Sequence, residues 1–160
     1  MNEVPLFSSL NIKSITLRNR IVLSPMCQYK AKDGMISDWH LQHYSRFAFS
    51  GLGAAFVEAT GVTPEGRIGH GCTGIWNDDH IKGLSKIAKT FKEYNCVSGI
   101  QLAHAGRKAS FLRPWDGASP ITKDDKIEPA WQTIGPSAIP INENSPVPKE
   151  MSLEDINNVK

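Results

Sequence analysis

Chemically capable side chains follow a short apolar run in the stretch RIVLSPMCQY, residues 20–29. The run IVL is typical of a buried strand, and a serine and a proline then interrupt it. Met26, Cys27 and Tyr29 supply a thioether, a thiol and a phenol where an ordinary turn would use Gly, Asn or Asp. These soft, polarisable and redox-capable groups at the end of a strand predict a functional site.

Two further apolar segments end in groups that could contact a ligand. The segment VEATG, residues 57–61, ends in small residues where a flat ligand can approach the backbone, and Glu58 is its lone carboxylate. The segment IQLAHAGRK, residues 100–108, carries Gln101 inside an apolar run, and a buried amide needs partners. The sequence shows no carboxylate pair, no serine, histidine and aspartate constellation, and no glycine-rich phosphate loop. This chemistry favours holding a polar, planar ligand over hydrolysis.

The surrounding segments alternate between strand and helix patterns. Apolar runs near residues 20–24, 54–62 and 97–106 predict strands, and amphipathic repeats over 37–51 and 77–95 predict helices. Apolar strands that alternate with amphipathic helices indicate an α/β protein with a parallel sheet buried on both faces. The helix N-caps are predicted at Ser37 or Asp38 and at Asn77 or Asp78.

The three predicted strands are expected to lie side by side and parallel. The order β-α-β-α-β and the right-handed crossover rule favour this arrangement. Sites in parallel α/β folds gather at the carboxyl ends of the strands. We therefore expect Cys27, Ala59 and Gln101 to lie on one rim.

The segment over residues 110–150 has a different composition. It is rich in Pro, Asp, Ser and Trp, has no helical period, and contains only short apolar runs. A loop of this length inside a compact domain is unusual and is often functional. A helix is predicted to begin after it, with Ser152 as the N-cap and Asp155 in a capping-box position.

The composition limits the class of protein. The chain has 160 residues, of which 40% are hydrophobic and 21% charged, which is typical of a globular protein. A net charge of +2 gives no argument for nucleic acid or for an anionic membrane as a partner. Three irregularly spaced cysteines indicate neither a disulfide framework nor a zinc site, so free thiols in a reducing cytoplasm are expected. No apolar stretch has the length of a signal peptide or a membrane span.

Several strings together resemble the Old Yellow Enzyme family of flavin-dependent ene-reductases. They are LRNRIVLSPMCQY, VEATGVTPEGRI, GIWNDDHI and GIQLAHAGRKAS, and they occur in the family's order and spacing. RPWDG and GPSAIP resemble the longer loop of its bacterial thiol-containing branch, which includes NADPH dehydrogenases and xenobiotic reductases. The resemblance runs from Leu6 to Lys160. It implies that residues 1–160 form the N-terminal portion of a (β/α)8 barrel, with three strands, two helices and the long loop.

The resemblance also implies roles for single residues. In the family, NADPH or NADH reduces FMN, and the flavin then reduces alkenes activated by a carbonyl or nitro group. The thiol of Cys27 would tune the flavin's redox potential, and Tyr29 would point its hydroxyl at the small-molecule substrate. The amide of Gln101 can both donate and accept at the pyrimidine end of the ring. The residues that the resemblance assigns to FMN are Ser24, Pro25, Met26, Cys27, Ala59 and Gln101.

The resemblance stops short of a whole barrel, which needs about 250 residues and eight strands. The 160 residues contain no counterpart of the family's His-x-x-His or His-x-x-Asn motif, of the tyrosine after it, or of the FMN phosphate loops. Two other readings therefore stay open, a non-catalytic truncated fragment and a small flavin-binding module. The sequence also leaves two protein partners open, a second copy of the chain or a polypeptide that completes the barrel.

Structural roles are expected for the remaining candidate residues. Cys72 and Cys96 are interpreted as buried core cysteines. His40 and His43 lie three residues apart on a predicted helix, but the sequence shows no third metal ligand, so packing and capping are expected. The remaining pair, His104 and Arg107, is expected to hold the loop or a subunit contact.

Overall fold

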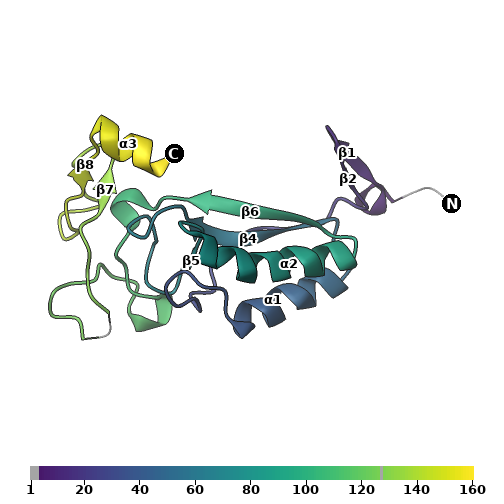
Figure 1. Ribbon diagram of the computed structural model, residues 1–160, viewed down its shortest axis with the longest axis horizontal. Helices are drawn as coiled ribbons and strands as arrows, with labels where there is room; N and C mark the ends of the chain where they lie inside the picture. Colours follow the sequence, from purple (N-terminus) through teal and green to yellow (C-terminus); the bar gives the residue numbers. More distant parts are fainter. Residues whose placement is uncertain (1–3, 127) are drawn as a thin grey trace.

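The computed structural model describes residues 4–126 and 128–160 (Figure 1). Three parallel strands form the centre: β3 (Val22–Leu23), β4 (Ala54–Gly61) and β6 (Val97–Ala103). Helices α1 (Asp38–Phe49) and α2 (Ile81–Glu93) lie side by side along one face of the sheet (Figure 1). The predicted α/β fold of parallel strands and helices is confirmed, and the described residues form an open sheet rather than a closed barrel.

The strand order follows the chain order. Strand β3 pairs with the first half of β4, where Val22 lies opposite Ala54, and β6 pairs with β4 along its whole length. The short strand β5 (Thr73–Gly74) pairs with the carboxyl end of β4 on the edge that β3 also uses. The prediction of three adjacent parallel strands is therefore confirmed.

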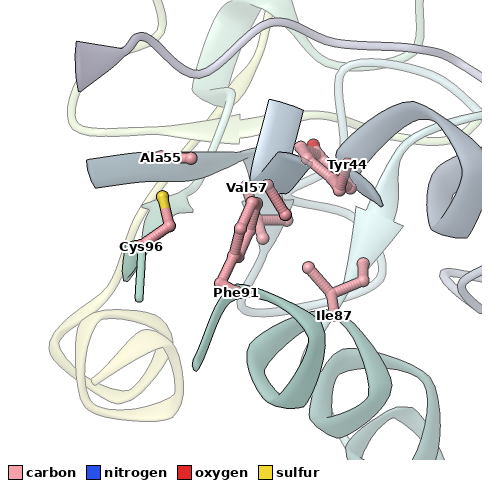
Figure 2. Packing of buried hydrophobic residues seen from close by; sticks show 7 residues of the cluster. Tyr44, Ala55, Val57, Ile87, Phe91 and Cys96 are labelled. Carbon is pink, nitrogen blue, oxygen red and sulfur yellow. The ribbon is translucent and has the colours of Figure 1, made fainter. Parts of the chain in front are cut away.

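The hydrophobic core lies between the sheet and the two helices (Figure 2). Phe91 of α2 is completely buried, and its ring meets that of Tyr44 from α1 edge to face at 6.0 Å. The helical spacing of apolar residues accounts for this arrangement because it places them on one face of each helix. The core residues are Tyr44, Ala48, Ala55, Val57, Ile87, Phe91 and Cys96.

The opposite face of the sheet is open, so the expectation of strands buried on both faces is wrong. Phe56 of β4 and Val22 of β3 are exposed there. Phe56 is the one exposed residue of β4, and its neighbours Ala55 and Val57 belong to the core on the other face. Within residues 4–126 and 128–160, helices cover only the face on which the core lies.

Side-chain caps begin the two long helices near the predicted residues. Ser37 is the N-cap of α1, and His40 Nδ1 accepts hydrogen bonds from the Ser37 backbone N–H at 3.1 Å and from Ser37 Oγ at 2.9 Å. The capping role expected for His40 is confirmed. Asn77 Oδ1 accepts from the Asp79 N–H at 3.0 Å and begins a short 3-10 turn that continues into α2.

The remaining elements are short. The segment over 110–150 crosses beyond the carboxyl ends of β4 and β6 (Figure 1). The capping box predicted at Ser152 is present, because Asp155 N–H donates to Ser152 Oγ at 3.1 Å. Of the helices in the described part of the chain, none combines the length and the apolar character that crossing a membrane requires. The short elements of the fold are the 3-10 turns Pro5–Phe7, Asp78–His80, Gly106–Lys108 and Pro114–Asp116, the strands β1 (Leu10–Ile12), β2 (Ile15–Leu17), β7 (Ile134–Gly135) and β8 (Lys149–Glu150), and helix α3 (Leu153–Val159).

Candidate functional site

The carboxyl ends of the parallel strands bring together three residues that the sequence singled out. Ala59 of β4 lies directly opposite Gln101 of β6 in the strand register. The backbone N–H of Ala59 donates a hydrogen bond to the Cys27 thiol, which comes from the loop after β3. Cys27, Ala59 and Gln101 therefore share one rim of the sheet, as expected from the topology.

The thiol of Cys27 lies against a second cysteine. Cys72, which immediately precedes β5 and is 1% exposed, donates its thiol proton to Cys27. This hydrogen bond lowers the pKa of Cys27, against the opposing effects of burial and of the Glu58 charge. The same contact and burial raise the pKa of Cys72. Cys72 is buried as expected, but sequence reasoning missed its contact with Cys27, because the two residues are far apart in the chain.

Replacing Cys72 tests this contact. Cys72→Ala is expected to raise the pKa of Cys27, since it removes a hydrogen bond to the thiolate. Alkylation of Cys27 by iodoacetamide, followed across pH by peptide mass spectrometry, would then need a higher pH. Cys72→Ser is the matched control, because its hydroxyl can still donate. An unchanged pH profile in a folded Cys72→Ala variant would contradict the assignment.

Tyr29 occupies an unusual backbone conformation at the same rim. Its φ is 53°, in the left-handed region that a non-glycine residue adopts rarely and that occurs often at functional sites. Gly71 leaves room for this turn, because a Cβ there would lie 2.5 Å from the Tyr29 carbonyl oxygen. Burial of the hydroxyl, with the nearby thiol of Cys27, raises the pKa of Tyr29 to about 12.

The long loop reaches this rim. Trp115 meets the Tyr29 ring edge to face, with the ring centroids 6.1 Å apart. The ammonium of Lys30 lies 4.8 Å from the Trp115 ring and 5.3 Å from the ring of Trp39 on α1. The segment over 110–150 therefore contributes a wall beside Tyr29.

The residues before Cys27 lie at the surface of the open rim. Ser24 is exposed, Pro25 is partly buried, and Met26 is 46% exposed. Gln101 is also exposed, so the expectation that its amide is buried within an apolar strand is wrong. Gln101 belongs to the open face of the sheet, where a polar side chain needs no protein partner.

Glu58 has no carboxylate partner, as the sequence indicates, but other polar groups surround it. Its carboxylate is completely buried. Oε2 accepts the backbone N–H of Gln28 at 2.8 Å, and Oε1 accepts from the hydroxyl of Tyr44 at 3.4 Å. Nε2 of His40 lies 3.3 Å from Oε1. The strand pattern of β4 indicated that residue 58 would lie in a strand, but only the fold shows that α1 surrounds it.

The other histidines have structural surroundings. His43 meets the rings of Tyr44 and Phe47, and burial lowers the pKa of its imidazole. Arg107 donates to a carbonyl of the long loop at 3.3 Å, so it holds the loop as one alternative expected, whereas His104 accepts the Gly106 N–H at 3.2 Å within its own turn. Among residues 4–126 and 128–160 no cluster of three or more His, Cys, Asp or Glu side chains could hold a metal ion.

The rim has the donor set that a flat, polar ring such as that of FMN requires. The exposed amide of Gln101 can donate and accept at one edge of a ring. Ala59, opposite it, is small enough for a ring to approach the backbone. The thiol of Cys27, which contacts Ala59, is a polarisable group at this rim, and the exposed thioether of Met26 precedes it in the chain. The residues present therefore fit FMN.

Comparison with known proteins agrees with this geometry. The sequence model of the NADH:flavin oxidoreductase / NADH oxidase family matches residues 5–160. The chain is 48% identical to an NADPH dehydrogenase of Geobacillus thermodenitrificans over 158 residues, covering 98% of this chain and 41% of the relative. It is 44% identical to an NADPH dehydrogenase of Bacillus licheniformis over 158 residues, again covering 98% of this chain and 41% of the relative.

The fold is likewise similar to part of several solved structures. The old yellow enzyme from Trypanosoma cruzi superimposes with a TM-score of 0.75 at 26% identity, covering 96% of this chain and 44% of that chain. Morphinone reductase superimposes with a TM-score of 0.75 at 22% identity, covering 96% and 41% of the two chains. The chain thus spans about two fifths of the length of the relatives that it matches, and it corresponds to their N-terminal part.

Proposed function

Because the chain belongs to the NADH:flavin oxidoreductase / NADH oxidase family, we propose that it forms the flavin-facing N-terminal part of an NAD(P)H-dependent oxidoreductase. The substrates would be alkenes activated by a carbonyl or nitro group. The observation that carries the proposal is the meeting of Cys27, Ala59 and Gln101 at the carboxyl ends of parallel strands. Sites of parallel α/β proteins lie at this end of the sheet.

The side chains of the rim would hold and tune FMN. Gln101 would bind the pyrimidine edge through its amide, and Ala59 would let the ring lie close to the backbone. Cys27 would lie at the reactive edge with Ser24, Pro25 and Met26 beside it. FMN, when bound, would supply hydride transfer from the nicotinamide to the alkene. The hydrogen bond from Cys72 lowers the pKa of Cys27, and negative charge on this sulfur would make reduction of a nearby electron-accepting ring less favourable.

Tyr29 would bind the substrate as a hydrogen-bond donor. With its pKa raised to about 12, its hydroxyl stays protonated at neutral pH. A protonated phenol can donate to the carbonyl or nitro oxygen of an activated alkene. The strained backbone at φ 53° and the Trp115 ring edge would fix the direction of this donor.

A partner that completes the barrel is favoured by the open face of the sheet. Val22 and Phe56 expose apolar surface there, and the outer edge of β6 has no paired strand among the described residues. Such surfaces and edges are normally covered. We therefore propose that the remaining strands of a barrel cover this face. The alternatives are that a second copy of the chain covers it, or that the chain is a non-catalytic fragment. The three free cysteines agree with a protein that functions in a reducing cytoplasm.

Titration of the purified chain with FMN tests the proposal. Binding is expected to quench flavin fluorescence, and Gln101→Ala is expected to weaken it roughly 3–30-fold, the loss of one or two hydrogen bonds. Gln42→Ala is the matched control, because Gln42 is an exposed glutamine on α1, away from the rim. An absence of quenching in the parent, or equal affinity in Gln101→Ala, would contradict the proposed site.

A further inference from the structure

Glu58 lies at a β-bulge behind the rim. The register between β4 and β6 shifts between Val57 and Ala59, so Glu58 is the extra residue. A bulge redirects a side chain that strict alternation would place on the other face. Val57 and Glu58 are accordingly both buried on the helix side, whereas Phe56 before them is exposed on the open side. The bulge therefore directs a carboxylate into the region between the sheet and α1.

Two residues of α1 lie close to one carboxylate oxygen of Glu58. The hydroxyl of Tyr44 donates to Oε1 at 3.4 Å and accepts the Glu58 backbone N–H at 2.8 Å. Nε2 of His40 lies 3.3 Å from Oε1, but it makes no hydrogen bond to any described atom. Glu58 and His40 are completely buried, and Tyr44 is 2% exposed. A buried carboxylate is costly unless such partners satisfy it, so its presence needs a reason.

The second carboxylate oxygen of Glu58 contacts the loop that contains Cys27 and Tyr29. Oε2 accepts the backbone N–H of Gln28 at 2.8 Å, across 30 residues of sequence. Gln28 lies between Cys27 and Tyr29, and Tyr29 has a left-handed φ of 53°. Such a backbone persists only when its surroundings fix it. A charge-assisted hydrogen bond to the neighbouring amide is a strong constraint of this kind.

We infer that Glu58 is a positioning residue, which fixes the turn of Cys27 and Tyr29 through the Gln28 N–H while Tyr44 holds its carboxylate. The value of this turn to flavin and substrate rests on the proposed function. The hydrogen bond itself does not, so the two are tested separately. A carboxylate that merely filled the core would leave the Gln28 amide unaffected when it is replaced.

Amide hydrogen exchange of the full chain, measured by NMR without FMN, tests the inference. In the parent, the Gln28 amide proton is expected downfield and protected, as for an amide bound to a charged acceptor. Glu58→Leu removes the acceptor and is expected to speed Gln28 exchange by roughly tenfold or more. Glu58→Gln keeps one acceptor oxygen and is expected to restore part of the protection. Glu93→Gln is the control, because Glu93 is an exposed carboxylate on α2.

Each outcome decides the inference. Faster exchange confined to Gln28 and its neighbours, in the order Leu, Gln, parent, supports it. Equal Gln28 exchange in a folded Glu58→Leu variant overturns it. Should the variants fail to fold, the parent still decides, because an unprotected Gln28 amide without a downfield shift overturns it and a protected, downfield one supports it. Failure of the parent to bind FMN would overturn the proposed function and leave this result unchanged.

Discussion

Phe91→Ala is expected to unfold the chain. The Phe91 ring is completely buried between the two helices and β4, where it meets Tyr44 (Figure 2). Truncating a buried phenylalanine costs about 3–5 kcal/mol, because burial is lost and a cavity remains. The total stability of a domain is only about 5–15 kcal/mol, and the open face of this sheet favours the lower part of that range. Loss of the near-UV circular dichroism and of a cooperative thermal transition would report the unfolding.

Phe56→Ala is the matched control for this prediction. Phe56 belongs to the same strand that Phe91 packs against, but it is 38% exposed on the open face. Removing it sacrifices less buried surface, so the variant is expected to keep the fold with a smaller loss of stability. The account of the core would be wrong if Phe91→Ala melted like the parent, or if Phe56→Ala were the more damaging of the two.

The helices and their caps could be predicted because their signals are local. The Ser37 cap, the Asn77 cap and the Ser152 capping box each join residues within three positions of one another. The parallel order of the strands also followed from the alternation of elements. The rim of Cys27, Ala59 and Gln101 then required only the rule that parallel strands end at one edge.

Contacts between distant segments could not be predicted in this way. The bond from Gln28 N–H to Glu58 spans 30 residues and depends on a bulge in β4 that leaves no sequence signal. The contact between Cys27 and Cys72 depends on how β5 returns to the edge of β4. The burial of Gln101 was predicted wrongly for a related reason. The sequence of an apolar strand does not reveal whether another segment covers its second face.

Residues 1–160 alone, supplied with FMN, NADPH and cyclohexenone, are expected to show no ene-reductase turnover. Gln101 and Met26 are exposed on an open rim, so the described residues do not exclude water from a bound ring. Tyr29 is the one phenol that the site offers for the substrate oxygen. A preorganised donor contributes about 2.7–4 kcal/mol to such a transition state, and the resemblance places further donors and the phosphate contacts outside these residues. The assay is the oxidation of NADPH followed by absorbance, with product analysis.

Two comparisons make this assay decisive. The NADPH dehydrogenase of Geobacillus thermodenitrificans, of which this chain matches 41%, serves as the positive control under the same conditions. A variant with both Cys27→Ala and Gln101→Ala controls for reaction by free flavin, because it lacks two contacts of the proposed site. Turnover of about 1–1000 per second by the parent, abolished in this variant, would mean that the rim is the active site and that one open sheet suffices. Equal, slow rates in both would be the reaction of free FMN, because a ring that is held only at its edge has no fixed position relative to Tyr29.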